Sequence, residues 1–321
     1  MKLLRGFHQI SDLGVSTAAT IGNFDGVHCG HLALLKKLRN QAERTNLPVL
    51  VMLFEPQPSE YFRGSQAPAR LSSFREKLDI LRQAGVDYVC CLKFNNHLAS
   101  MRAFEFAERI IFSLLKAKYL LIGEDFHFGH ERVGDIALLK DVGSKSGCDV
   151  DAFPDFFIDH QRVSSTRIRQ ALAAGDLEQA AHLLGRSYSM CGRGIRGDGR
   201  GRQWGIPTAN LSLHRLTLPV KGVFAVRVFR QGKPALNGVA NIGCRPTVDG
   251  SKNVLEVHLF DVNESLYGEM LQVNFLYKLR DEMKFASIDA LITQIHNDVN
   301  LAKIWFKQED NGSGYNVTIA Q

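Results

Sequence analysis

The sequence predicts an α/β protein with a doubly wound parallel sheet in its N-terminal part, followed by a small antiparallel β-barrel and a C-terminal helix. Up to about residue 185, apolar runs typical of buried strands alternate with amphipathic helical stretches. Past residue 188, glycines become frequent and short alternating segments follow one another closely. Such a rhythm is typical of a small antiparallel barrel. One long helical pattern then closes the fold.

In the first part, each expected element rests on its own apolar pattern. Strands are expected at residues 18–21, 49–54, 88–92 and 119–122, and helices at 31–44, 74–84 and 103–115. Helices between successive parallel strands cover both faces of the sheet. Ligands bind such sheets beyond the carboxyl ends of the strands. The segments 22–31 and 123–135 both follow strands, so we expect them at one crevice.

In the second part, strands are expected at residues 223–229, 238–242, 254–260 and 271–279. Ser287 is a plausible N-cap for the closing helix. The apolar stripe of that helix is expected to be buried, and it consists of Ile288, Leu291, Ile292, Ile295, Val299, Ala302 and Trp305. We therefore expect domains at 1–185 and 186–308, with a disordered tail at 309–321.

Composition restricts the class of protein. The 321 residues are enough for two domains, with 45% hydrophobic and 22% charged residues. The net charge of +6 suits anionic small molecules as well as weak nucleic-acid contact. No apolar run is long enough for a membrane span, and no signal peptide is evident. The six cysteines form no CxxC pair. We expect a reduced, cytoplasmic protein with no membrane, nucleic-acid or obligate protein partner.

Residues 22–31, GNFDGVHCGH, carry the strongest functional signal. Glycines at a strand-to-helix turn permit backbone conformations that a Cβ would forbid, and the helix N-terminus attracts anions. His28 and His31 would share one face of the helix, with Gly30 leaving room for a ligand. This layout suits a nucleoside triphosphate attacked at its α-phosphorus. A zinc pair is the alternative, but zinc requires further ligands at suitable spacing.

Residues 163–169, VSSTRIR, form a second candidate site. A capped helix running to Ala174 would explain one hydroxyl. It does not explain Ser164, Ser165 and Thr166 in a row with Arg169 one turn later. Three hydroxyls and a guanidinium at a helix start make a phosphate cradle, because arginine supplies forked donors to phosphate oxygens.

The second half contains one misleading motif and one useful motif. Residues 192–197 match GxGxxG, but a flexible loop follows instead of the helix that a dinucleotide site requires. No P-loop pattern occurs. Thr208 and Asn210, in the segment PTAN that begins at Pro207, offer two oxygen ligands on one face of an extended chain. Such oxygens suit Mg²⁺ on phosphates, and the preceding loop with Gly201 and Arg202 could fold over those phosphates.

Glu256 lies in an alternating segment, LEVHL at 255–259. The leucines and the valine form one face, and Glu256 shares the other face with His258. From the pattern alone, Glu256 would be a solvent-facing acid. A kinase acting on an alcohol benefits from a carboxylate that accepts the hydroxyl proton, so the catalytic interpretation also stays open.

The two phosphate motifs resemble those of the HxGH nucleotidyltransferases. More closely, the chain from near residue 3 to about 306 resembles the bacterial bifunctional riboflavin kinase/FAD synthetase family. The shared segments are FEPQP (54–58), GEDFHFG (123–129), ERVGD (131–135), GDLEQAAHLLGR (175–186), GVANIGCRPTV (238–248), LEVHLFD (255–261), LYG (266–268) and LRDEMKFAS (279–287). Gln57 stands where many relatives have His, His127 where Arg is common, and Trp204 and Ile206 where Leu and Phe are common.

For the first domain, the resemblance implies a nucleotidyltransferase-type fold that transfers AMP from ATP to FMN, releasing pyrophosphate. A phosphate monoester is already anionic, so alignment and charge stabilisation suffice. His28, His31 and Arg169 would be catalytic. The nucleotide would be bound by Gly22, Asn23, Phe24, Asp25, Gly30, Ser164, Ser165 and Thr166. Asp125, Phe126 and Phe128 are candidates for the flavin, although the two phenylalanines alternate like core residues.

For the second domain, the resemblance implies a riboflavin kinase that makes FMN with Mg-ATP. Thr208 and Asn210 would hold the metal and ATP, Glu256 would be the base, and Arg280 would lie near the flavin. Mg²⁺, ATP and flavins are therefore the expected cofactor and substrates. One alternative is a nucleotidyltransferase for another phosphorylated acceptor, with the barrel as a binding module. Another is a non-enzymatic nucleic-acid-binding or flavin-sensing protein.

Overall fold

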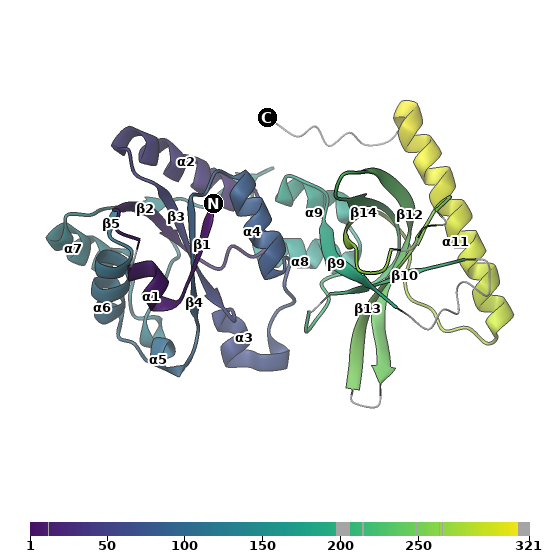
Figure 1. Ribbon diagram of the computed structural model, residues 1–321, viewed down its shortest axis with the longest axis horizontal. Coiled ribbons are helices and arrows are strands. Elements are labelled where there is room, and N and C mark those ends of the chain that lie inside the picture. Colours follow the sequence, from purple (N-terminus) through teal and green to yellow (C-terminus); the bar gives the residue numbers. More distant parts are fainter. Residues whose placement is uncertain are drawn as a thin grey trace. The chain divides into compact units, whose positions relative to one another are not determined.

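The computed structural model describes residues 1–11, 13–196, 206–213, 215–247, 250–262, 264 and 266–313. The chain forms two compact units (Figure 1). The first unit comprises Met1–Pro68 and Lys77–Ser164, and the second comprises Ala69–Glu76 and the chain from Ser165 onward. The boundary between catalytic domains that we expect after residue 185 stays a prediction.

The first unit is built on a six-stranded parallel sheet. Its strands are β1 (Lys2–Arg5), β2 (Thr17–Ile21), β3 (Val49–Glu55), β4 (Tyr88–Lys93), β5 (Ala117–Gly123) and β6 (Asp149–Phe153). They lie in the order β1-β4-β3-β2-β5-β6. All four expected strands are confirmed. Because the chain proceeds from β2 toward β3 on one side and from β5 toward β6 on the other, the strand order reverses between β2 and β5.

Helices cover both faces of this sheet. They are α1 (Gly6–Ser11), α2 (Cys29–Thr45), α3 (Pro58–Arg63), α4 (Phe74–Gln83), α5 (Asn96–Ala99), α6 (Ala103–Glu105) and α7 (Ile136–Ser146), with 3₁₀ turns η1 (Gly64–Gln66) and η3 (His130–Arg132). One core cluster joins Ile10 of α1 and Leu139 of α7 to alternate strand residues such as Ala19 and Ile21. No residue of α2 belongs to this cluster, and α2 contacts β2, β3 and β5 from the other side (Figure 1).

The expected helix at 103–115 begins as α6 and continues as a π-helix, η2 (Phe106–Leu114). Its bonds run five residues back, as from Leu115 N to the Ile110 carbonyl at 3.0 Å. The wider turn aligns residues four to five positions apart. Phe106, Ile110 and Leu115 are accordingly all buried against the sheet.

The second unit contains a closed barrel in the order β10-β13-β12-β11-β14-β9. Its elements are α8 (Ser165–Ala174), α9 (Leu177–Leu184), β9 (Ser189–Ile195), β10 (Ala209–Ser212), β11 (Gly222–Arg230), β12 (Lys233–Thr247), β13 (Gly250–Leu259), β14 (Met270–Arg280), α11 (Ile288–Gln308) and a π-helical turn η4 (Glu309–Ser313). The four expected barrel strands are confirmed. The glycine-rich β9 and the short β10 complete the closure and were not anticipated.

Alternate residues separate the inside of the barrel from the outside. Leu255, Val257 and Leu259 are buried inside, while the outer face carries Val223 and Val239 under α11. Ser287 caps α11 by accepting a bond from Ala290 N at 3.2 Å, as expected.

The buried stripe of α11 differs from the expected one. Ile288 is 62% exposed, whereas Asp298 and Phe306 are buried with Ala302. The buried contact lies in the second half of the helix, where Ala302 and Phe306 meet the outer barrel face. Residues 309–313, expected as the start of the tail, form the turn η4, and residues 314–321 lie outside the described part of the chain.

Candidate active sites

The turn between β2 and α2 has an unusual backbone. Phe24 and Val27 are non-glycine residues with φ of +46° and +40°, and Gly26 has φ of +79°. Such left-handed conformations cost energy unless the surroundings hold them. Gly22 N donates to the Met52 carbonyl at 3.2 Å, and Val27 N donates to the Phe24 carbonyl at 3.3 Å. The turn is therefore a fixed shape at the carboxyl end of β2.

His28 and His31 form a reciprocal cap at the start of α2. Nδ1 of His28 accepts from the His31 main-chain N–H, and Nδ1 of His31 accepts from the His28 N–H, both at 3.3 Å. The two rings stack with centroids 3.7 Å apart and planes at 15°. Because both Nδ1 atoms accept, the neutral rings carry their protons on Nε2. This arrangement presents two parallel N–H donors to an anion.

The lack of a side chain at Gly30 allows the His28 ring to pack closely against the backbone. A Cβ there would lie 3.3 Å from the His28 ring and from Phe156 Cβ. A side chain at position 30 would therefore crowd these two groups, and the room that we expected for a ligand stays a prediction. Gly22 has a similar role, because a Cβ there would lie 3.2 Å from the Phe24 ring. That ring lies 4.8 Å from the His31 ring, so the turn and the histidine pair are packed together.

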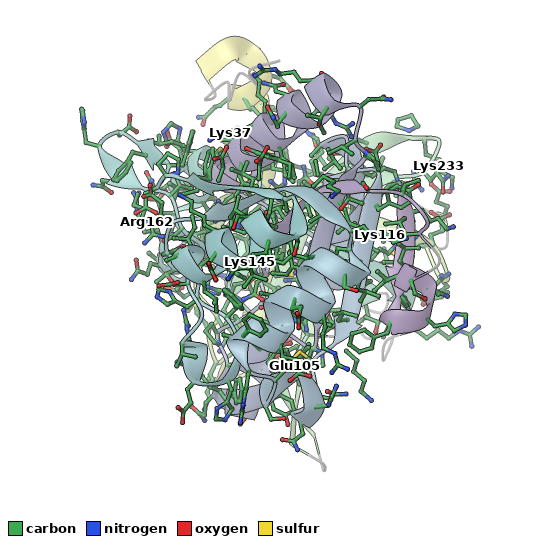
Figure 2. The ribbon with its side chains drawn as sticks, turned by 90° about the vertical axis from the view of Figure 1, so that its left-hand side faces the viewer. Lys37, Glu105, Lys116, Lys145, Arg162 and Lys233 are labelled. Atoms are coloured by element: carbon green, nitrogen blue, oxygen red, sulfur yellow. The ribbon has the colours of Figure 1, made fainter. Side chains whose placement is uncertain are left out.

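The segment after β5 follows the strand next to β2, since β5 pairs directly with β2, and the shared crevice stays a prediction. Asp125 is paired with Arg162 at 2.5 Å, and Arg162, labelled in Figure 2, also pairs with Asp155 at 2.8 Å. The bond to Asp125 raises the pKa of the Arg162 guanidinium. Arg162 belongs to β8 (Gln161–Arg162), which forms a hairpin with β7 (Phe157–Ile158). Asp125 keeps 67% of its side chain exposed.

The two phenylalanines proposed to contact the flavin differ in how deeply they are buried. Phe128 is only 6% exposed and belongs to the core, where it lies 5.6 Å from Phe106. Phe126 stacks on Phe128 at 5.5 Å and is half-buried. The core interpretation therefore holds for Phe128, while a flavin contact of Phe126 stays a prediction.

Another aromatic group at the carboxyl ends of β3 and β4 was not singled out from the sequence. Phe54, Tyr61, Phe62 and Phe94 contact one another edge to face, with centroids 5.2–5.7 Å apart. Phe62 is 67% exposed and Tyr61 is 39% exposed. Gln57, beside them in sequence, is 4% exposed, and its Nε2 has no hydrogen-bond partner among the described residues. Aromatic side chains left in water suit a flat ligand.

The hydroxyl-rich motif begins α8, as expected, and the helix ends at Ala174. Ile168 and Leu172 are buried, whereas Thr166 is exposed. Nε of Arg169 donates to the Ala69 carbonyl at 2.6 Å. Ser164 ends one segment of the first unit, and Ser165, Thr166 and Arg169 belong to the second. Their convergence with the histidine pair on one nucleotide stays a prediction.

On the barrel, strand register brings the remaining candidates into one row. Asn210 pairs with Glu256, Glu256 with Asn241, Asn241 with Val223, and Val223 with Arg280. Directly opposed residues on neighbouring strands point to the same face of a sheet. Since Val223 packs under α11, the row lies on the outer face. Glu256 and Arg280 are three strands apart, roughly 14 Å along the row.

The segment PTAN is fixed by the strand that carries Glu256. Ala209 and Leu211 are buried inside the barrel, so Thr208 and Asn210 share the outer side, as expected. The Nδ1 atom of His258 lies 2.9 Å from the Pro207 carbonyl. Because that carbonyl can only accept, His258 must donate from Nδ1. His258 thus ties the metal-ligand candidates to β13.

Arg280 has a structural partner that the sequence did not indicate. Nε lies 2.9 and 3.1 Å from the two carboxylate oxygens of Asp298, and a terminal nitrogen lies 2.7 Å from Oδ2. The Asp298 side chain is 3% exposed and also accepts from Gln294 at 2.9 Å. The guanidinium is thereby held against α11, and its predicted contact with a flavin stays a prediction.

The sequence alone did not indicate a role for Asn241, Asp298 or Lys77. Each of them contacts a partner that lies far away in the chain. Asn241 lies beside Glu256 only through strand register. Lys77 donates from Nζ to the Asn23 carbonyl at 2.5 Å. An asparagine within an alternating strand segment and a lysine in an amphipathic helix carry no local signal of a functional role.

Gly201 and Arg202 lie outside the described residues, and the GxGxxG segment lies largely within β9, not at a helix start.

None of the cysteines whose side chains the structure describes forms a disulfide: they are Cys29, Cys90, Cys91, Cys148 and Cys191. Burial raises the pKa of the Cys148 thiol to about 12, and burial also raises the pKa values of Cys90 and Cys91.

Within the described part of the chain, no three His, Cys, Asp or Glu side chains gather as a metal site. No described helix is both long and apolar enough to cross a bilayer.

Comparison with known proteins covers both units. Residues 12–167 match the FAD synthetase family model, and residues 184–306 match the riboflavin kinase family model. A bifunctional riboflavin kinase/FMN adenylyltransferase of Haemophilus influenzae is 47% identical over 306 residues, covering 95% of this chain and 99% of that protein. The protein of the same description from Escherichia coli K12 is 48% identical, covering 95% of this chain and 98% of that one.

A solved structure shares the fold. The crystal structure described as a macrolide-efflux protein from Streptococcus pneumoniae has a TM-score of 0.79 and 31% identity, and the match covers 93% of this chain and 97% of that one. The likeness extends across both the sheet unit and the barrel unit.

Proposed function

We infer the roles of individual residues from one premise: this chain belongs to the family of bifunctional riboflavin kinase/FMN adenylyltransferases. It is an enzyme that phosphorylates riboflavin to FMN and transfers AMP from ATP to FMN, giving FAD. The FAD synthetase and riboflavin kinase matches account for its N-terminal and C-terminal parts. A barrel that merely binds, or a non-enzymatic role, is therefore excluded.

In the kinase site, Glu256 accepts the proton of the ribityl 5′-hydroxyl as that oxygen attacks the γ-phosphorus of ATP. The observation that supports this role is the register pairing of Glu256 with Asn210 and Asn241 on the outer barrel face. Thr208 and Asn210 supply the oxygen ligands that Mg²⁺ prefers, and Pro207 lies beside them. When bound, the metal neutralises phosphate charge. Gly201 and Arg202 contact the phosphates of ATP.

In the adenylyltransferase site, the phosphate of FMN attacks the α-phosphorus of ATP, and pyrophosphate leaves. The attacking phosphate is already an anion, so no protein base is needed. His28 and His31 donate from Nε2 to the charge that develops on the phosphates. Arg169, Ser164, Ser165 and Thr166 stabilise the leaving pyrophosphate. The turn residues Gly22, Asn23, Phe24 and Asp25 hold the nucleotide, and Gly30 admits the His28 ring.

The flavin contacts differ between the two sites. In the first site, the exposed Tyr61 and Phe62 offer ring faces to the flavin more readily than the buried Phe128 does. Asp125 and Phe126 follow β5, which lies two strands from β3 in the sheet. In the second site, Arg280 approaches the flavin while Asp298 fixes its guanidinium. We also propose that the enzyme is cytoplasmic and has no obligate protein partner.

A time course tests the two-site function. The pure protein is incubated with riboflavin, ATP and Mg²⁺, and the flavins are separated by chromatography. We expect FMN to appear first and then to give way to FAD. FMN without FAD would contradict the assignment of the first site, and the absence of FMN would contradict that of the barrel.

A further inference from the structure

Lys77 is a buried cation that the assigned chemistry does not use. Its side chain, on α4, is 1% exposed and is among the largest fully buried side chains of the described residues. Burying an ammonium group is costly unless polar partners compensate for the lost hydration. Nζ donates to the Asn23 carbonyl at 2.5 Å. A buried lysine is thus bonded to the turn that follows β2.

The carbonyl that accepts the hydrogen bond from Lys77 lies next to the residue with the strained backbone. Asn23 directly precedes Phe24, whose φ of +46° is unfavourable for a residue with a Cβ. A strained backbone persists only where its surroundings over-determine it. The Asn23 carbonyl belongs to the same peptide unit as the Phe24 N–H. Fixing this carbonyl therefore fixes the orientation of the peptide unit that precedes the strained residue.

From Phe24, contacts lead directly to the histidine pair. The Phe24 ring lies 4.8 Å from the His31 ring, and the His31 ring lies 3.7 Å from the His28 ring. Rotating the Asn23–Phe24 peptide would move the Phe24 ring away from His31. The ammonium also polarises this peptide, which makes its N–H a stronger donor, because linked hydrogen bonds reinforce one another.

We propose that Lys77 is a positioning residue for adenylyl transfer. It holds the Asn23–Phe24 peptide, and through Phe24 it sets the place of His31 and His28. This proposal rests on the proposed role of the histidine pair. It requires that the effect of Lys77 pass through Phe24 and be confined to the first site.

The primary test is Lys77→Met, which keeps an unbranched side chain of similar length but removes the charge and the donor. Displacing catalytic groups by a fraction of an ångström reduces rates strongly, so we expect kcat for FAD formation from FMN to fall about 10- to 100-fold. Riboflavin phosphorylation in the same sample should change less than about twofold. Lys37→Met is the matched control, since Lys37, labelled in Figure 2, is an exposed lysine on α2. An unchanged kcat in Lys77→Met would overturn the proposal.

A double-mutant cycle with Phe24→Leu separates positioning from general support of the fold. If Lys77 acts through Phe24, the two losses in kcat are not additive. Additive losses would overturn the proposal. Nitrogen NMR of the histidine rings adds a spectroscopic readout, in which Lys77→Met should shift the Nε2–H signals of His28 and His31 and Lys37→Met should not.

If Lys77→Met does not fold, Lys77→Leu replaces it in the same cycle, because leucine also lacks both the charge and the donor. Wild-type protein that makes no FAD would contradict the proposed function itself. The proposal on Lys77 is contradicted separately, by a variant that leaves kcat and the ring signals of an active enzyme unchanged.

Discussion

The two candidate sites of this protein are built in opposite ways. In the first unit, His28 and His31 are three residues apart and cap each other across the start of one helix. On the barrel, Asn210, Asn241 and Glu256 come from three strands and meet only through register. The histidine pair takes its capping geometry from local backbone bonds, and the turn before it is also held by Lys77. A site made of several strands depends on correct barrel closure, so the two should respond differently to substitution.

The largest effect is expected from Glu256→Gln, which preserves shape and register but removes the carboxylate. Loss of a general base lowers rates by roughly 10²–10⁴-fold, so riboflavin phosphorylation should fall within this range. FAD formation from supplied FMN should be unaffected, because it uses the other site. Initial rates with riboflavin and with FMN measure both activities. Glu269→Gln, a half-buried acid elsewhere on the barrel, is the control. A parallel loss of both activities would refute the separation of the sites.

The reciprocal change is made at His28. His28→Asn retains a side chain that can cap α2 but removes the stacked ring and its Nε2–H donor. We expect FAD formation from FMN to fall roughly 10²–10³-fold, as when a preorganised donor to developing charge is lost. Riboflavin phosphorylation should persist. The exposed His97→Ala serves as the control. If the His28→Asn variant were as active as wild type, only the capping role of His28 would remain.

Asp298→Asn tests whether the barrel site depends on its long-range framework. The Asp298 side chain is 3% exposed and the Arg280 side chain 18% exposed, so removing one charge leaves the other largely buried and unmatched. We expect the second unit to lose about 3 kcal/mol of stability. Thermal unfolding, followed by tryptophan fluorescence, measures this loss, because both tryptophans, Trp204 and Trp305, belong to the second unit. The affinity for riboflavin, measured by flavin fluorescence, should weaken if Arg280 approaches the flavin. Unchanged affinity in a folded variant would restrict Arg280 to a structural role.

The smallest effect is expected at His258, which ties Pro207 to β13 through Nδ1. His258→Leu removes one hydrogen bond, worth about 1 kcal/mol, so KM for Mg-ATP in riboflavin phosphorylation should rise about fivefold. His258→Asn places an amide donor near the Nδ1 position and should restore most of the affinity. Equal KM values in the Leu and Asn variants would show that the bond to Pro207 is irrelevant to nucleotide binding.

Sequence alone determined the features whose cause lies within a few residues. Apolar periodicity predicted the strands β2 to β5 and β11 to β14, because burial of one face recurs at the period of the backbone. Glycines and two histidines at a strand-to-helix turn predicted the first site. Strand β9 escaped because its glycines obscure alternation, and β10 escaped because four residues are too few to show a period. The expected stripe of α11 failed in part because its first turn does not share the buried contact made by Ala302 and Phe306.

Tertiary structure alone decided which distant residues meet. Strand register placed Asn241 and Arg280 in one row with Glu256, and a one-residue shift of any strand would have sent its side chains to the other face. Packing put Phe128 in the core, gave Arg280 the partner Asp298, and carried Lys77 to the Asn23 carbonyl. The last two contacts join residues 18 and 54 positions apart in the chain. No local sequence pattern predicts such contacts, because they result from the packing of whole helices and strands against one another.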